Sequence, residues 1–524
     1  MDVVIGIDTG TTATKGVAAG PDGDLRATAS VHYPLSVPAP GRAELDPDRL
    51  RSAAVEALAD VAKQCRERGD RVIAVGLSSF LHAVVPMDRD GRPRGPLVTW
   101  ADARAGRQSR AIAAATDAKR LQERTGTPVH PMAPLSKLAW WRENDADLLR
   151  ETPRWGGVKE LVLGALADAP FRLDLSVASG TGMYDIHARR WDDEALEITG
   201  VRREQLAEVV PTTQRLRLHP DAASAAGLPP DTPLIIGAAD GPLANLGVGA
   251  TPAGVAAVSL GTSGALRTVV DAPVADQSGR LFCYALTEDR WVIGGAVNNA
   301  GSVVRWAGQS FAGGFARPAA EGEDADERDA ALLEEAAGAP AGSDGLLCLP
   351  YLLGERAPWW RSGLRGAYLG LRREHGRPHL VRAAVEGVCQ QLALVRDSFT
   401  TAGREVTEVR ATGGAAASAL WVRTLASALD LPVAVADTPE GTALGACLLS
   451  LHALGELPDL DTAAALVAID EPVRPDPQQA RMYRRLRPLV ERSALAVSDV
   501  VAELDELAPE PLPDTEEAVT HGSH

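Results

Sequence analysis

Residues 3–18 read VVIGIDTGTTATKGVA, and this stretch decides the fold. Its apolar run predicts a buried strand, its Gly-Thr turn a tight reversal, and its second apolar run an antiparallel partner strand. Residues 254–270 repeat the pattern as GVAAVSLGTSGALRTVV. The two copies stand about half a chain apart, and a repeat at that spacing predicts two similar domains that each begin with a hairpin.

Around the two hairpins, apolar runs alternate with segments whose apolar residues recur at helical spacing. Such alternation is typical of an α/β layer fold. We expect one domain over residues 1–248 and a second over 249–508, followed by a disordered acidic tail over 509–524. The expected strands lie at residues 71–77, 97–100, 234–237 and 433–435, and the expected helices at 46–69, 416–430, 441–455 and 476–507.

The chain has 524 residues, of which 45% are hydrophobic and 23% charged, as in globular proteins of two or three domains. No apolar run approaches the length of a membrane span, so we expect none. The start of the chain lacks a basic region and a cleavage site, so we also expect no secretory signal. The five scattered cysteines argue against a disulfide framework or a zinc site and predict a cytoplasmic location.

Most of the net charge of −17 lies in residues 321–335 and 503–517, which are typical of a solvated surface or tail. The rest of the chain carries no basic stripe, so the sequence disfavours nucleic-acid binding. The oligomeric state is not readable from the sequence, and a homodimer is the one assembly we consider.

The two Gly-Thr turns predict a phosphate clamp, because glycine lets an anion approach the backbone and the hydroxyls add donors. Neither turn is a Walker A loop, and each taken alone is more often a plain hairpin. Asp8 and Asp240 follow apolar strands, where a carboxylate can bind Mg²⁺ or accept a hydroxyl proton. The alternative for Asp240-Gly241 is a structural turn. Residues 413–418, GGAAAS, can seat a flat adenosine or serve tight helix–strand packing.

Two longer motifs identify a resemblance. Residues 132–144 read MAPLSKLAWWREN, and residues 366–386 read GAYLGLRREHGRPHLVRAAVE. With both turns, they resemble the FGGY carbohydrate kinase family of the actin/Hsp70/sugar-kinase ATPase superfamily, from residue 3 to about 455. This resemblance implies two ribonuclease-H-like domains that close on ATP, Mg²⁺ and a sugar in an interdomain cleft. It assigns the catalytic base to Asp240. It assigns ATP and Mg²⁺ contacts to Asp8, Gly10, Thr11, Thr12, Lys15, Gly261, Thr262, Ser263, Gly413, Gly414 and Ala415, with Asp8 and Asp240 at the metal.

Four stretches are more similar to gluconate kinases than to xylulose or glycerol kinases of that family: TWADAR (99–104), TGTPVHPM (125–132), GGAVNN (294–299) and LPYLLGERAP (349–358). We expect His82 and Asp102 to bind hydroxyls and Trp100 to stack on the carbon chain, and we assign Asn298 and Arg104 to the substrate as well. Related kinases often read Gln-Met-His where this chain has Phe80-Leu81-His82, so a polar amide contact is replaced by apolar bulk beside the expected sugar.

A gluconate carboxylate needs a cation, and the candidates are Arg104, His130 and Lys137. Each has an alternative: a helix-start ion pair for Arg104, a packed loop histidine for His130, and an architectural role for Lys137. The leading prediction is ATP-dependent phosphorylation of a sugar acid, D-gluconate to 6-phospho-D-gluconate. The alternatives are a kinase for xylulose or another polyol, or, in a different class, a non-catalytic nucleotide-binding regulator.

Overall fold

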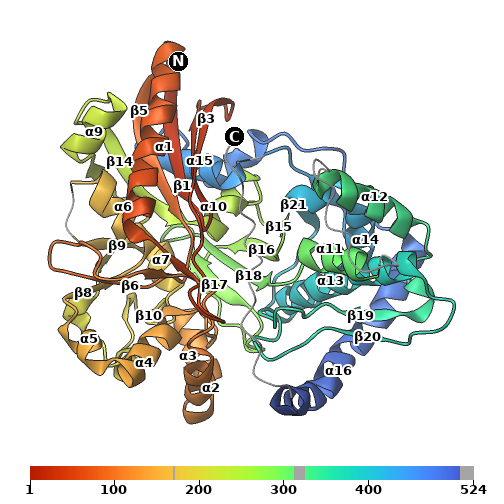
Figure 1. The fold of residues 1–524 in the computed structure, drawn as a ribbon. Coiled ribbons are helices and arrows are strands. Elements are labelled where there is room, and N and C mark those ends of the chain that lie inside the picture. The colour runs from red at the N-terminus through yellow and green to blue at the C-terminus, as the bar shows by residue number, and fades with distance from the viewer. Residues whose placement is uncertain (169–170, 312–324, 439, 508–524) are drawn as a thin grey trace, which may run out of the picture.

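The computed structural model describes residues 1–168, 171–311, 325–438 and 440–507, which form two lobes that lie side by side (Figure 1). A six-stranded sheet forms the centre of the first lobe. In it β1 pairs antiparallel with β2 and parallel with β5. The strands, in spatial order, are β13 (Arg215–Arg217), β14 (Pro233–Ala239), β5 (Arg71–Ser79), β1 (Asp2–Thr9), β2 (Ala13–Ala19) and β3 (Leu25–His32).

The second lobe repeats this arrangement, as the duplicated hairpin predicts. Its first strand pairs antiparallel with the next along the chain and parallel with a later one, as β1 does with β2 and β5. The expectation of two similar α/β domains is therefore confirmed. In spatial order the strands are β17 (Phe282–Ala285), β18 (Trp291–Val297), β16 (Gly264–Val270), β15 (Val255–Leu260), β21 (Glu408–Thr412) and β22 (Val433–Val435).

Helices cover both faces of the first sheet because side chains alternate along β1. Ile5 and Ile7 pack against α1 (Pro47–Glu67), whose N-terminus is capped by Asp46. Val4 points to the other face and packs against α15 (Gly441–Leu454). Figure 1 shows α15, in blue, against the red strands of the first lobe. The helix α15 comes late in the chain but packs on the first sheet. The domain boundary near residue 248 stays a prediction.

The helix α15, which follows β22, also packs against α10 (Asp240–Gly247), which follows β14. The helices that follow these two corresponding strands therefore meet. On the second sheet, α13 (Arg377–Thr401) and α14 (Ala419–Leu429) bury their apolar sides in a shared core, and α16 (Pro477–Leu507) packs on both. The helices expected near 416–430, 441–455 and 476–507 are confirmed.

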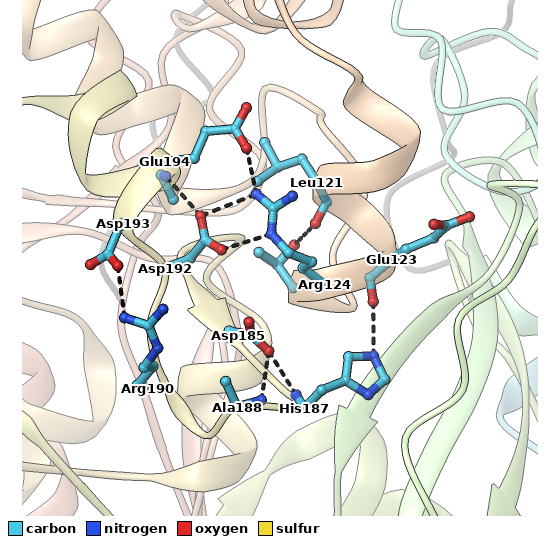
Figure 2. Close-up of polar contacts among 12 residues, drawn as sticks. Leu121, Glu123, Arg124, Asp185, His187, Ala188, Arg190, Asp192, Asp193 and Glu194 are labelled. Carbon is cyan, nitrogen blue, oxygen red and sulfur yellow. Dashed lines mark hydrogen bonds and ion pairs between the residues drawn. The ribbon is translucent and has the colours of Figure 1, made fainter.

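Helical segments inserted between β5 and β14 enlarge the first lobe. Figure 2 shows how two of them are joined: Arg124 of α3 (Ala118–Thr125) donates to Asp192, 2.9 Å away, and to Glu194 of α8 (Asp193–Thr199), 2.6 Å away. His187 meets the Glu123 carbonyl of the same α3 at 3.1 Å. These polar groups satisfy one another, so the cluster is structural.

The remaining elements are short strands and helices around these cores. The strands are β4 (Glu44–Leu45), β6 (Val85–Met87), β7 (Leu97–Val98), β8 (Arg154–Gly156), β9 (Arg172–Asp174), β10 (Tyr184–Asp185), β11 (Arg190–Trp191), β12 (Glu208–Val210), β19 (Leu347–Leu349) and β20 (Ala367–Leu369). The helices are α2 (Gly106–Ala115), α4 (Pro134–Asn144), α5 (Ala146–Glu151), α6 (Val158–Leu166), α7 (Leu175–Ser179), α9 (Pro220–Ala226), α11 (Gly301–Ser310), α12 (Ala325–Ala337) and the 3₁₀ turns η1 (Arg203–Gln205), η2 (Ser343–Gly345), η3 (Gly414–Ala417) and η4 (Leu460–Ala465).

In the described part of the chain, no helix combines the length and apolarity that a membrane crossing requires. All five cysteines are buried and free. The tail over 509–524 and parts of both acidic segments lie outside the described residues. The structure holds a single chain, so the homodimer and the cytoplasmic location stay predictions.

Candidate active site

Three cavities adjoin one another between the lobes. The first, about 500 Å³, lies among α10, β21 and α15; the second, about 270 Å³, extends from it; and the third, about 190 Å³, follows the turn after β1. Asp240 lines the first and second cavities, and Gly10 the second and third. Asp240 therefore stands where the two larger spaces meet.

A β-bulge in β14 aims Asp240 at this junction. Pairing of β14 with β5 shifts register between Ile235 and Ala238. Gly237 lies there with φ +75°, and a Cβ on it would sit 1.7 Å from the Leu77 carbonyl oxygen, so only glycine fits. Beyond the bulge Asp240 is the first residue of α10, and its Oδ1 accepts from Gly241 N at 2.8 Å. Asp240 and Gly241 therefore begin a helix, and they are not the plain turn considered as the alternative.

A buried lysine holds the bulge from behind. Lys159 Nζ donates to the carbonyls of Ile236, at 2.8 Å, and Ala238, at 3.2 Å, and lies 3.4 Å from Asp174 Oδ2. Lys159 and Asp174 are fully buried. The lysine thus satisfies carbonyls that the bulge removes from the ladder. Sequence reasoning missed this support, for which the scarcity of lysine in an arginine-rich chain was the only signal.

Two carboxylates of the site influence each other. Burial raises the pKa of Asp8 to about 6, against a hydrogen bond from Ser78 Oγ at 2.7 Å, and the charge of Asp240 raises it further. Burial also raises the pKa of Asp240, while the neighbouring Arg267 and Arg356 guanidiniums lower it. Two negative charges in this space are unfavourable without a cation, which is what a metal or a basic side chain supplies.

The phosphate residues expected after β1 line the cavities. Asp8, Thr12 and Lys15 face the third cavity, and Gly10 and Thr11 the second. Lys15 Nζ lies 3.1 Å from Glu440 Oε1, which also lines the third cavity.

Only some of the other residues expected to contact the nucleotide line these cavities. Ser263 lines the second cavity, while the exposed Gly261 and Thr262 accept backbone hydrogen bonds from the start of α11. Gly413 and Gly414 line the first cavity, and Ala415 is not among its lining residues.

His82 and Trp100 line the second cavity, as expected for substrate contacts. His82 has φ +69°, a strained conformation for a residue other than glycine. Its Nδ1–H donates to the Gly180 carbonyl at 2.7 Å, and burial lowers its pKa to about 3. The imidazole is therefore neutral and leaves Nε2 as an acceptor, 3.5 Å from the Tyr284 hydroxyl.

Asp102, Arg104 and Asn298 are not among the residues that line these cavities. Arg104 Nε donates to Asp102 Oδ1 at 2.8 Å, and the same guanidinium contacts Glu44. Asp102 also accepts from Ala43 N at 2.8 Å. Arg104 therefore forms ion pairs with Asp102 and Glu44, as in the alternative considered for it. Asn298 donates to the Leu353 carbonyl at 3.2 Å.

Lys137 and His130 lie behind the wall of the second cavity. The fully buried Lys137 Nζ donates to the carbonyls of His82, at 2.8 Å, and Met132, both of which line that cavity. His130 Nδ1 accepts from Met132 N at 3.3 Å, and its ring meets Trp360 edge to face. Both therefore support the wall, in line with the architectural alternatives.

Two arginines that the sequence reasoning did not single out do line the second cavity. Arg356 lies with its guanidinium 5.2 Å from the centre of the Trp100 ring, and its buried Nε has no hydrogen-bond partner. Its loop is held by the buried Glu355, which accepts from Asn298 N at 2.6 Å. Arg267 on β16 lines both larger cavities. A lone charge in the apolar run 264–270 was its signal in the sequence.

Comparison with known proteins identifies the family. The N-terminal domain model of the FGGY family of carbohydrate kinases matches residues 3–247, and the C-terminal model matches residues 256–454. The chain belongs to the FGGY family of carbohydrate kinases. This FGGY kinase is 39% identical over 488 residues to a gluconokinase of Bacillus subtilis, covering 93% of this chain and 94% of the relative.

Solved FGGY kinases share its fold. A gluconate kinase and a xylulose kinase, both from Lactobacillus acidophilus, each superpose with a TM-score of 0.88 at 32% identity and cover 96% of this chain. The comparison covers 99% and 100% of those two chains. The α/β architecture of this FGGY kinase is thus that of solved sugar kinases.

Proposed function

We propose that this FGGY kinase transfers the γ-phosphoryl group of ATP to a sugar acid, converting D-gluconate to 6-phospho-D-gluconate. The observation that carries the proposal is the charge of the second cavity. Its charged lining residues are Asp240, Arg267 and Arg356, and His82 is neutral, so the space carries a net positive charge. Such a cavity favours an anionic acceptor over a neutral polyol. The similarity to a named gluconokinase supports the same choice.

ATP is the phosphate donor of this proposal, and the first cavity suits its adenosine. Gly413 has φ +95°, and a Cβ on it would lie 2.4 Å from the Leu260 carbonyl oxygen. With no side chain at Gly413 or Gly414, a flat base can lie directly on the backbone there. The phosphates would then extend toward Thr12 and Lys15 in the third cavity.

Mg²⁺ fits the carboxylates of this site. Burial raises the pKa of both Asp8 and Asp240, and the charge of Asp240 raises the pKa of Asp8 further. Among the described residues no three His, Cys, Asp or Glu side chains form a metal cluster. This agrees with a magnesium ion that takes one or two carboxylates and otherwise phosphate oxygens and water. When bound, Mg²⁺ would neutralise charge on the β- and γ-phosphates.

In the proposed reaction Asp240 is the general base. The C6 hydroxyl of gluconate gives its proton to the Asp240 carboxylate as its oxygen forms a bond to the γ-phosphorus. The bond from that phosphorus to the bridging oxygen breaks, and its electron pair stays on ADP. Arg356 of the second lobe lies over the Trp100 ring of the first, so this contact joins the two lobes beside the sugar cavity.

The sugar-acid carboxylate is assigned to Arg356. Its Nη2 donates to the Val297 carbonyl at 3.1 Å, while Nε remains buried without a partner. A guanidinium held in this way can donate to a carboxylate without losing side-chain freedom. His82 and Ser263 line the same cavity, and we assign the hydroxyls of the sugar acid to them.

A coupled ADP-release assay tests the proposal with gluconate, xylulose, ribulose and glycerol as acceptors. We expect gluconate to give the highest kcat/KM. A preference for xylulose would instead favour the alternative that the solved xylulose kinase supports. Nucleotide binding without ADP release on any acceptor would favour the non-catalytic regulator.

A further inference from the structure

Arg267 stands at the junction where phosphoryl transfer is proposed to occur. An ideal Cβ on Gly241 would lie 3.4 Å from Arg267 Nε, and one on Gly294 would lie 2.9 Å from Arg267 Cγ. The absent side chains of these two glycines therefore leave room for the arginine between β18 and the start of α10. This places the guanidinium directly beside the peptide that follows Asp240.

The N–H donors of the Arg267 guanidinium are not used within the described part of the protein. Within the described ranges it forms no hydrogen bond and no ion pair, although it is partly buried and faces the two larger cavities. Its nitrogen atoms are not among the enclosed polar atoms of the described residues, so its N–H groups are accessible to a ligand in these cavities. Arg356 lies close enough to influence it, so two cations share one nearby carboxylate, and the surplus charge calls for an anion.

The position decides which anion this is. Arg356 lines only the second cavity, whereas Arg267 also lines the first, with Asp240 and Gly413. In gluconate the carboxylate and the C6 hydroxyl are at opposite ends of the carbon chain. A group beside the base that faces C6 therefore cannot bind the carboxylate of the same molecule.

We propose that Arg267 is a catalytic residue that contacts the phosphoryl group during its transfer from ATP to the acceptor. The inference rests on the proposed function for the direction of transfer. As the acceptor oxygen bonds to the γ-phosphorus and the bond to ADP breaks, negative charge spreads over the equatorial oxygens. The unpaired N–H groups of Arg267 donate to those oxygens. No proton leaves the arginine, because its role is electrostatic.

The first test compares Arg267→Met with Arg267→Lys and wild type on the acceptor that gives the highest turnover. We expect Arg267→Met to lower kcat by about 10²–10³-fold, with little change in KM for ATP or the acceptor. Arg267→Lys keeps the charge and should recover part of kcat. A kcat for Arg267→Met within about threefold of wild type, or a raised KM with unchanged kcat, overturns the proposal.

A second measurement needs no acceptor and separates this inference from the choice of sugar. Calorimetry gives the affinity for Mg-ADP with and without aluminium fluoride, a planar mimic of the phosphoryl group in transfer. Wild type should bind ADP more tightly with aluminium fluoride. Arg267→Met should lose about tenfold or more of that gain while its affinity for ADP alone is retained. An equal gain in both proteins, or no gain in wild type, overturns the proposal.

Arg356→Met is the matched control because it removes a second guanidinium from the same cavity. It should raise KM for gluconate and leave the gain from aluminium fluoride in place. If both variants lose that gain equally, Arg267 has no special place at the transfer point, and the proposal is wrong. Unchanged thermal unfolding of Arg267→Met excludes misfolding as the cause of lost turnover.

Discussion

Two charge clusters of this FGGY kinase have opposite compositions. Around Arg104, one guanidinium is shared by two carboxylates, and the side chains of Arg104, Asp102 and Glu44 are 7%, 0% and 14% exposed. Around Asp240, one carboxylate faces two guanidiniums, and the guanidinium of Arg267 has no hydrogen-bonding partner among the described residues. Charges that satisfy one another hold the fold, whereas charges left over are available to a ligand.

The change with the largest expected effect is Asp240→Asn, which removes the proposed base from the second cluster. We expect kcat to fall by about 10²–10⁴-fold, because an amide cannot accept the hydroxyl proton. ADP-release kinetics measure the loss, and calorimetry should show ATP affinity largely retained. A variant with near-normal turnover would remove Asp240 as the base.

The first cluster is tested through stability. Arg104→Ala leaves Asp102 buried without its partner, so we expect unfolding to become easier by about 3–5 kcal/mol in urea titrations. The matched control is the double variant Arg104→Met with Asp102→Asn, which leaves only the partly exposed Glu44 charged and should recover part of that loss. KM for gluconate and for a neutral polyol should shift equally. A selective rise for gluconate would instead support Arg104 as the carboxylate partner.

Arg356→Met tests the second cluster through the binding of the acceptor. A charge-assisted hydrogen bond is worth about 1.5–3 kcal/mol, so KM for gluconate should rise about 10–100-fold. KM for a neutral polyol should change far less, and steady-state kinetics with both acceptors give the ratio. Arg356→Lys keeps the charge and should lose less. Equal increases for the two acceptors would contradict the assignment of the carboxylate to Arg356.

Local patterns in the sequence were sufficient for the sheets and the strand ends. The duplicated hairpins over 3–18 and 254–270 show continuous apolar runs and tight turns, which are properties of neighbouring residues. Asp8 and Asp240 were predictable because Asp8 ends an apolar run and Asp240 directly follows one. The β-bulge at Gly237 was not, because its need for glycine comes from the Leu77 carbonyl, far away in the chain.

The arginines show what local pattern cannot supply. Arg104 stands in a stretch similar to gluconate kinases, but its partner Glu44 is 60 positions away, and the sequence does not reveal that the pair forms. Arg356 meets Trp100 only because the two lobes face each other. Whether a guanidinium is already paired is a property of the tertiary structure. The sequence could therefore predict that a cation binds the substrate, but it could not identify which arginine provides it.

Asp8→Asn is expected to give the smallest change in the free energy of unfolding. The raised pKa of Asp8 determines whether that change stabilises or destabilises the protein. Burial raises the pKa of Asp8 to about 6, above its ordinary value of 3.8, so the folded protein holds this proton more tightly than the unfolded chain. Ionising Asp8 therefore opposes folding, with no penalty below about pH 4 and the full penalty above about pH 6. Without ligands, Asp8→Asn should unfold about 1–3 kcal/mol less readily than wild type at pH 8.

That advantage should shrink as the pH falls through 6 and vanish near pH 4, in urea titrations at several pH values. Asp2→Asn is the control of opposite sign, because a hydrogen bond from Arg71 lowers the pKa of Asp2 and its charge favours folding. Asp2→Asn should therefore not gain stability at pH 8. Activity of Asp8→Asn should fall although its fold is more stable, because the carboxylate that opposes folding is the one proposed to hold Mg²⁺. A variant no more stable than wild type at pH 8 would show that the charge of Asp8 is already compensated within the protein.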